Sequence, residues 1–308
     1  MSEKVEKKKR KLDVNQRKGI IGGSSMGACI GLSTYKSPYE VYEEFMGIQH
    51  EVTPEKAEIF EMGHQLEGFI AKQAERIFGI KLRRVNFALV HPKYEWLVCH
   101  PDREVVGKVN GKKIGVEIKS SSTYDNARWG DPDTDQIPMD YLCQCHDYMM
   151  CGDYDEVWLF RFSNNRLTRY IITKDEELET VILTKVVKFV DDVKSGWVPP
   201  FSDVKQVTAK FCQETGGSVV ADEKIENLVD ELNSARLAKK NAEERIDAIK
   251  IQVIDFMKDK KYLFSRTGEK LCSYYQSKRT QIDIKRLQAE KPELCAQYSK
   301  ESTSMVLR

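Results

Sequence analysis

Three charged residues that lie close together in the chain, Asp102, Glu117 and Lys119, could do metal-dependent chemistry if their side chains met. The stretch that joins them reads as an antiparallel hairpin, because alternating apolar residues flank Asn110-Gly111. That dipeptide is the strongest short-range signal for a two-residue hairpin turn. The pattern therefore predicts two paired strands that carry the charged residues toward their open ends.

The register of this hairpin decides whether the charged side chains share a face. If the residues that flank the turn pair with each other, counting outward places Glu104 opposite Glu117 and Asp102 opposite Lys119. Side chains alternate faces along a strand, so all four charged residues would lie on one face. The other face would be apolar and buried, with Val105, Val109, Ile114, Val116 and Ile118.

The chemistry follows from the short distance between the two acids. Opposed side chains in a hairpin lie about 4.5–5.5 Å apart and diagonal ones about 7–8 Å, so Asp102 and Glu117 could ligate one cation. Ligation by oxygen alone suits Mg²⁺, or Mn²⁺ as a substitute, rather than zinc. Lys119 would orient or deprotonate a water, or neutralise an oxyanion. The alternative is a solvated face, the usual fate of charged residues two apart on a strand.

The overall composition permits such an enzyme without demanding it. A chain of 308 residues is long enough for one α/β core and an appended domain, and its formal net charge is +1. Residues 1–18 hold eight Lys or Arg against three Asp or Glu. We expect residues 1–14 to be a disordered basic tail, with a phosphate-binding arm or a nuclear localisation patch as alternatives.

The sequence also predicts the compartment of the protein. No apolar run approaches the ~18 residues that span a bilayer, and no secretory segment is present. We therefore expect a cytoplasmic protein that makes no contact with membranes. Its eight cysteines include no CxxC pair, so we expect reduced, buried thiols rather than disulfides or an iron–sulfur cluster.

The order of elements predicts an α/β fold. A long amphipathic helix over residues 54–78 precedes two short strands and the hairpin, and a helix over 136–153 follows it. A second hairpin around Asn164-Asn165 and a helix over 176–196 come next. Near the start of the chain, Ser24 or Ser25 would cap a helix whose N-terminus is suited to bind an anion.

The last third of the chain has a different pattern. From about residue 222 to 258, apolar residues recur at heptad spacing, interrupted only by Lys239, which predicts one long helix. Its apolar seam would pack within the chain or against another copy, and the two readings remain open. A small hairpin around Thr267-Gly268 and a helix broken at Pro292 follow. An interleaved set of aromatic and basic residues could bind single-stranded DNA or pack at a strand edge: Tyr274, Tyr275, Lys278 and Arg279.

The motifs resemble those of a known family. "PD", fourteen intervening residues and then "EIK" resemble the PD-(D/E)xK nuclease superfamily. The ordered set "IGGSSMGACIGLSTYKSPYEVYEEFMG", "MGHQLEGFIA", "HPD", "VEIKSSS" and "YLCQCHDYMMCG" resembles the YqaJ-type viral recombinases, which are kin of the lambda-type phage exonuclease. The resemblance covers roughly residues 15–200. It implies a restriction-endonuclease-like core, a mixed central sheet flanked by helices, here with a C-terminal long-helix extension.

The resemblance also implies an activity and its partners. The expected function is a Mg²⁺-dependent 5′→3′ exonuclease that degrades one strand of linear double-stranded DNA. The 3′ overhangs would pass to a single-strand annealing protein for phage-type homologous recombination, in a phage or a prophage-bearing bacterium. Two alternatives remain: a structure- or sequence-specific endonuclease on the same fold, and a non-catalytic protein that binds DNA ends.

The roles of the catalytic residues are carried over position by position. Asp102 and Glu117 match the metal-binding carboxylates, and the Ile118 carbonyl matches a backbone ligand. Glu67 matches a helix glutamate that assists a second metal ion. The remaining catalytic matches are Lys119, as the catalytic lysine, and Gln144, which would position the attacking water or the scissile phosphate.

DNA-binding positions follow in the same way, with some departures from the family pattern. Arg17 and Ser24 match residues that hold the 5′-terminal phosphate, and Arg128 is the nearest candidate for a further phosphate-binding arginine. His100 and Arg103 stand where the family often has serine and glycine, and His100 could bind a phosphate.

Three segments are therefore expected along the chain. Residues 1–14 would be the basic tail, residues 15–203 the nuclease domain, and residues 204–308 the heptad helix with a small hairpin and helix region. Through the heptad seam or another surface, we expect a homo-oligomer.

Overall fold

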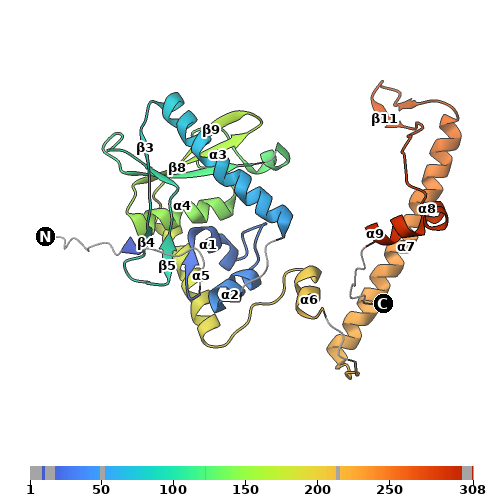
Figure 1. The fold of residues 1–308 in the computed structure, drawn as a ribbon, viewed down its shortest axis with the longest axis horizontal. Helices are drawn as coiled ribbons and strands as arrows, with labels where there is room; N and C mark the ends of the chain where they lie inside the picture. The colour runs from blue at the N-terminus through green and yellow to red at the C-terminus, as the bar shows by residue number, and fades with distance from the viewer. Residues whose placement is uncertain are drawn as a thin grey trace. The chain divides into compact units, whose positions relative to one another are not determined.

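The computed structural model describes residues 9–10, 18–48, 53–121, 123–212, 216–299 and 307. The chain forms two compact units, Met1–Ala209 and Lys210–Arg308. Figure 1 shows the helices and strands that make up each unit. None of the helices in the described ranges is long and apolar enough to cross a membrane.

The first unit is built on a mixed five-stranded sheet (Figure 1). Its strand order is β3-β6-β7-β8-β9, in which only β7 and β8 run parallel to each other. The connection between two parallel neighbours needs a crossover, and the helix α4 lies in that connection. The bounds are Leu82–Arg84 for β3, Arg103–Val105 for β6, Ile114–Ser120 for β7, Glu156–Ser163 for β8 and Arg166–Thr173 for β9.

Helices cover both faces of this sheet. α3, Pro54–Phe78, packs on one face through an apolar cluster that includes Ile70, Ala74, Val116 and Phe160. The other face packs against a second cluster that α1, α4 and α5 share with β8 and β9. The α/β fold class, a mixed central sheet flanked by helices, is thereby confirmed. The bounds of these helices are Gly23–Cys29 for α1, Met139–Gly152 for α4 and Glu176–Lys194 for α5.

A smaller sheet of order β1-β4-β5-β2 adjoins α4. β4, Ala88–Val90, pairs antiparallel with β5, Leu97–Cys99, and β2, Ile21–Gly22, pairs parallel with β5. β1 consists of Lys9–Arg10 and pairs antiparallel with β4. The prediction of a disordered tail is therefore wrong at these two residues, whose backbone extends the edge of the sheet.

The first two helices begin in different ways. α2, Pro38–Met46, starts with a capping box in which Ser37 and Glu40 satisfy each other's backbone amides. α1 starts after Gly22 without a side-chain cap, so the prediction that Ser24 or Ser25 is the N-cap is wrong. The helix begins earlier because its first turn packs tightly on α4.

Two short helices and the C-terminal unit complete the described part of the chain. A 3₁₀ helix, η1, spans Thr123–Arg128, and α6 spans Val204–Lys210. The C-terminal unit contains the predicted long helix, the hairpin and the helix broken at Pro292. Their bounds are Glu223–Met257 for α7, Tyr262–Phe264 for β10, Lys270–Ser273 for β11, Ile284–Glu290 for α8 and Pro292–Tyr298 for α9.

Candidate active site

The hairpin that carries the charged residues turns where the sequence predicts. Val109 and Lys112 form an antiparallel bridge, and the two residues between them, Asn110 and Gly111, have φ values of 51° and 80°. Two successive left-handed residues match the right-handed twist of the flanking strands. The Asn-Gly signal therefore predicted this turn correctly.

Beyond the turn the register differs from the prediction. Glu104 lies opposite Gly115, so its predicted opposition to Glu117 is wrong. Four residues separate Glu104 from the turn bridge, but only two separate the bridge from Gly115, and the longer side contains Gly107 at φ 83°. Because this irregularity shifts the pairing by an even number of residues, each side chain stays on its predicted face.

Glu117 is the centre of the site. Its side chain is only 2% exposed and faces α4 from the middle of β7. Its Oε1 accepts a hydrogen bond from Gln144 Nε2 at 2.9 Å and pairs with Lys119 Nζ at 2.5 Å, and its Oε2 accepts one from the Tyr148 hydroxyl at 2.5 Å. The structure therefore brings three of the predicted catalytic residues, Glu117, Lys119 and Gln144, into direct contact.

Asp102 joins this group from the loop before β6. Its Oδ2 accepts a hydrogen bond from the backbone N–H of Ile118 at 2.8 Å, which fixes the carboxylate beside β7. Burial, and then the negative charge of Glu117, raise the pKa of Asp102 well above its usual value. Because the charged form of Asp102 is disfavoured beside Glu117, a cation between the two carboxylates would be stabilising.

Lys119 supplies positive charge at the same place. Burial by itself would lower the pKa of Lys119, but the carboxylates of Glu117 and Asp102 outweigh burial, and the net shift is upward. The ammonium also lies 5.2 Å from the ring centre of Tyr141 on α4. In this arrangement Lys119 is a cation held by the acids, which suits charge neutralisation better than proton abstraction.

Glu67 is placed differently from the other acids. It lies on α3, which covers the opposite face of the sheet from α4, and it pairs with the buried guanidinium of Arg103 and, at 4.0 Å, with Arg84. Arg103 also donates to the backbone oxygen of Asp102 at 2.6 Å, which links Glu67 to the site indirectly. Within the described ranges, no cluster of three or more acidic, histidine or cysteine side chains could hold a metal ion.

The predicted DNA-binding residues are spread around the site. Arg17 lies outside the described residues. Ser24 is exposed on the first turn of α1, and His100 is exposed just before Asp102. Ser24 and the side chain of His100 are not in contact with each other. The backbone oxygen of His100 accepts a hydrogen bond from the Tyr148 hydroxyl at 3.1 Å.

Arg128 is the last residue of η1. Its contacts lead toward Tyr141, the residue whose ring lies against the Lys119 ammonium. The Arg128 guanidinium donates to Thr34 Oγ1 at 3.0 Å and pairs with Asp140 Oδ1 at 3.3 Å. It also lies 6.0 Å from the ring centre of Tyr35, which stacks on Tyr141. Arg128 is thus tied to α4 and to the loop after α1, close to the residue that covers Lys119.

Tyr148 is a site residue that the sequence reasoning did not select. It is buried, accepts a hydrogen bond from Gln144 Nε2 at 2.8 Å, and donates to Glu117. One signal was available, because Tyr148 follows Gln144 by four residues and so shares its helix face. The contact with Glu117 is a tertiary feature, which helical spacing alone does not indicate.

Close packing of α1 against α4 fixes the far side of the site. A Cβ atom at Gly23 would lie 2.9 Å from Asp147 Oδ2 and 3.2 Å from Gln144 Cγ. A Cβ at Gly27, one turn later, would lie 2.8 Å from the Asp140 Cα. Both glycines are needed for this approach, so the first helix holds the Gln144 side chain in place.

The donor set suits a hard divalent ion. Asp102 and Glu117 offer carboxylate oxygens, which are typical ligands of Mg²⁺ in proteins. The five thiols of the first unit for which burial is known are buried and free: Cys29, Cys99, Cys143, Cys145 and Cys151. The predicted reduced and buried thiols are confirmed for these five residues, whereas Cys212 is exposed and Cys272 and Cys295 are half-buried, so the predicted burial is wrong there.

Comparisons with known proteins agree with this site. Residues 14–155 match the family model of the YqaJ-like viral recombinase domain, which spans all the acids named above, Lys119 and Gln144. The uncharacterized protein YqaJ of Bacillus subtilis (strain 168) is 27% identical over 299 residues, which cover 94% of this chain and 90% of that protein. Residues 14–155 are therefore similar to the YqaJ-like viral recombinase domain.

Two solved structures resemble the chain more distantly. An alkaline exonuclease (LHK-Exo) from Laribacter hongkongensis is 16% identical, covers 64% of this chain and 95% of its own, and gives a TM-score of 0.47. A phage-related exonuclease from Haemophilus somnus 129PT is also 16% identical, covers 57% and 95%, and gives a TM-score of 0.39. Both scores lie below 0.5, so the fold assignment rests on the sheet order of the chain itself.

Proposed function

We propose that this protein is a Mg²⁺-dependent deoxyribonuclease that degrades one strand of linear double-stranded DNA from 5′ to 3′. Mn²⁺ would substitute for Mg²⁺, and the 3′ overhangs would serve a single-strand annealing protein in phage-type recombination. The observation that carries the proposal is the meeting of Asp102, Glu117, Lys119 and Gln144 around the second half of β7. The match of residues 14–155 to the YqaJ-like viral recombinase domain supports DNA as the substrate.

Two acids would hold the ion. Asp102 and Glu117 supply carboxylate oxygens, and the carbonyl of Ile118, the residue directly after Glu117, would be a further oxygen donor. A bound divalent ion supplies charge neutralisation for the scissile phosphate and lowers the pKa of a bound water. Gln144 and Tyr148 orient the Glu117 carboxylate through hydrogen bonds at 2.9 and 2.5 Å. They would keep its oxygens aimed at the same point during the reaction.

Lys119 and Gln144 would act on the substrate. The Lys119 ammonium pairs with Glu117, and in the complex with DNA it would stabilise negative charge on the phosphate or orient the attacking water. Gln144 can turn its amide from Glu117 toward a water or a phosphate oxygen. Glu67 would serve a second ion only after Arg103 releases it, so we place it last among the proposed catalytic residues.

DNA contacts are proposed for the residues around this group. Arg17, Ser24 and His100 would contact the 5′-terminal phosphate. Arg128 lies near Tyr141 and would contact the DNA backbone if it exchanged its partners, Thr34 and Asp140, for a phosphate.

A digest of three substrates with the full chain and Mg²⁺ tests the proposal. The substrates are linear duplex labelled at the 5′ end, linear duplex labelled at the 3′ end, and covalently closed circular duplex. We expect early release of the 5′ label as a nucleotide, retention of the 3′ label on long fragments, and an intact circle. Cutting of the circle would establish the endonuclease alternative instead.

A second comparison separates end recognition from catalysis. Linear duplexes with a 5′-phosphate and a 5′-hydroxyl report whether the terminal phosphate is required. No cleavage of any substrate, together with no heat of Mg²⁺ or Mn²⁺ binding by calorimetry, would favour a non-catalytic protein that binds DNA ends.

A further inference from the structure

The helix α7 carries a continuous apolar seam. Positions a and d of five heptads follow one another without a break, and Lys239 is the one charged residue among them. Of the 35 residues of α7, only Met257 is buried, by the β10–β11 hairpin next to it through Cys272. The seam residues are Ile225, Leu228, Leu232, Ala235, Lys239, Ala242, Ile246, Ile249, Val253 and Phe256.

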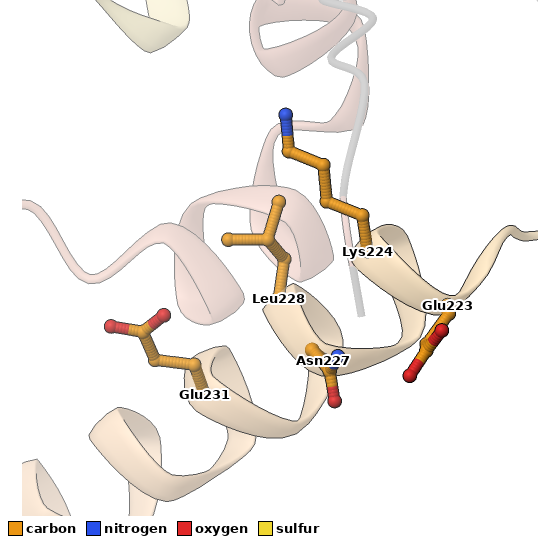
Figure 2. A pocket seen from close by; sticks show the side chains of 5 residues that line it. All are labelled: Glu223, Lys224, Asn227, Leu228 and Glu231. Atoms are coloured by element: carbon orange, nitrogen blue, oxygen red, sulfur yellow. The ribbon is translucent and has the colours of Figure 1, made fainter.

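Eight of the ten seam residues are exposed within the described residues of the C-terminal unit, and Leu232 and Val253 are half-buried. Ile246 and Ile249 are 51% and 52% exposed, and Phe256 is 76% exposed. Figure 2 shows Leu228 between Lys224 and Glu231 on the helix surface. These residues line an open depression of about 370 Å³. A helix of this length is about 52 Å long, and so long an apolar stripe requires a partner in water.

We propose that α7 pairs with α7 of a second copy of this chain, in antiparallel orientation. In the full-length antiparallel register, Ile225 lies in the same layer as Phe256 of the second copy, and the layers continue in steps of one heptad. The interface then consists of the α7 seam from both chains, with the two-fold axis between Lys239 and Ala242.

The central residue of the seam selects this orientation. In a parallel pair, Lys239 would face Lys239 of the second copy, and two like charges would meet inside the seam. In the antiparallel pair, Lys239 faces Ala242, which leaves room for its aliphatic stem to lie along the seam and its ammonium to reach water. Lys239 is 77% exposed in its side chain and lies 3.8 Å from Glu243 of its own helix.

The sizes of the other seam residues favour the same orientation. A parallel pair would stack Ala235 on Ala235 and Ala242 on Ala242, which leaves two thin layers in a seam of large residues. The antiparallel register sets Ala235 against Ile246 and Ala242 against Lys239. Small residues then meet large ones, and the layers have more even volumes.

The charged residues beside the seam also favour the antiparallel orientation. In the antiparallel register, Arg236 flanks Glu243 of the second copy, and two-fold symmetry makes this attractive pair twice. A parallel pair would instead set Arg245 against Lys250 of the second copy, which repels and offsets the attraction between Glu231 and Arg236. The antiparallel pairing therefore has the better charge complementarity.

The mass of the full chain in solution tests the interface. We expect Ile246→Asp/Ile249→Asp to reduce the mass by about twofold, measured by light scattering during size exclusion. The matched control is Ile251→Asp, because Ile251 is 68% exposed on the outer side of the helix and lies off the seam. An unchanged far-ultraviolet circular dichroism spectrum shows that α7 remains helical in the variants.

An equal mass for the wild type and the seam variant overturns the proposal, whether the chain is then monomeric or assembles through another surface. A loss of mass in the Ile251→Asp control of the same size as in the seam variant also overturns it.

The orientation is tested by reversing charges. In an antiparallel pair, Glu243→Arg sets Arg236 against an arginine and should raise the dissociation constant about tenfold. In a parallel pair, Glu243 faces Ala238, so the same change should have little effect. The double variant Arg236→Glu/Glu243→Arg should restore wild-type affinity; no restoration contradicts the antiparallel arrangement.

Discussion

The two units of the chain place polar and apolar residues in opposite ways. In α4 of the first unit, ten of fourteen residues are buried, and they include Asp140, Gln144, His146 and Asp147. In α7 of the second unit, one of 35 residues is buried, although its seam is apolar. Burying polar groups and exposing an apolar stripe both cost free energy of folding. The first is typical of a site that binds an ion or a substrate, and the second of a surface that binds another protein.

The difference indicates what each unit recognises. The half-buried carboxylate of Asp102 and the buried one of Glu117 lie beside one ammonium, that of Lys119, which suits the proposed binding of a further cation and a phosphate. The second unit presents a long helix with an exposed row of hydrophobic side chains, which is suited to bind a protein surface. The proposed chemistry and the proposed assembly therefore belong to separate units.

The largest expected effect comes from removing one charge at the centre of the first unit. Glu117→Gln keeps the shape of the side chain but loses a metal-binding carboxylate, so we expect nucleotide release from linear duplex to fall roughly 10³-fold or more. The control is Glu156→Gln, because Glu156 is also buried but binds Lys112 and Trp158 at the other end of the sheet. Nucleotide release by Glu117→Gln at a rate within tenfold of the wild type would contradict the proposal that Glu117 is a metal ligand.

Lys119→Met should have the next largest effect. The methionine retains the aliphatic stem but lacks the ammonium that pairs with Glu117, and we expect a loss of about 10²-fold in kcat. Lys113→Met is the matched control, since Lys113 binds the Gly152 backbone oxygen away from the acids. Equal rates for both variants would contradict a role for Lys119 in the reaction.

Tyr148→Phe tests whether the buried hydroxyl positions Glu117. Loss of one hydrogen bond should lower kcat about tenfold and leave the KM for DNA unchanged, because Tyr148 orients a ligand rather than the substrate. A weaker affinity for Mn²⁺ in calorimetry should accompany the lower kcat. Tyr170→Phe is the control, because the Tyr170 hydroxyl donates to the Gly130 backbone oxygen outside the site. A change in KM alone would argue for a different role.

Glu67→Gln should have a small effect on cleavage and a larger one on stability. The change leaves the buried Arg103 guanidinium without its charged partner, and we expect the free energy of unfolding to fall by about 2 kcal/mol in urea denaturation. Metal affinity should stay within threefold of the wild type. A loss of Mn²⁺ binding as large as that of Glu117→Gln would make Glu67 a ligand equal to the other acids.

Much of the first unit could be predicted from sequence because its signals are local. The bounds of α3, Pro54–Phe78, agree with the amphipathic pattern, and the turn at Asn164-Asn165 has the positive φ values that Asn tolerates. The apolar face of the 102–119 hairpin packs on α3 as its alternation predicts. Periodicity and turn residues act within a few positions, so one sequence suffices to identify them.

The parts that were missed depend on contacts between distant segments. The shift in the β6–β7 register arises around Gly107, whose conformation no pairing rule fixes. The pairing of Arg103 with Glu67 joins residues of two layers, and the hydrogen bond from Tyr148 to Glu117 joins a helix to a strand. Such contacts follow from how the elements pack, which local patterns do not determine.

One digest tests the central claim most directly, namely that Asp102 and Glu117 together hold the ion that cuts DNA. Wild type and Asp102→Asn are incubated with end-labelled linear duplex, each with Mg²⁺ and with a chelator, and nucleotide release is measured over time. The account predicts release only by the wild type with Mg²⁺, while both proteins show the same unfolding transition and DNA affinity. Release by Asp102→Asn at a rate near that of the wild type, or release by the wild type in the chelator, would contradict it.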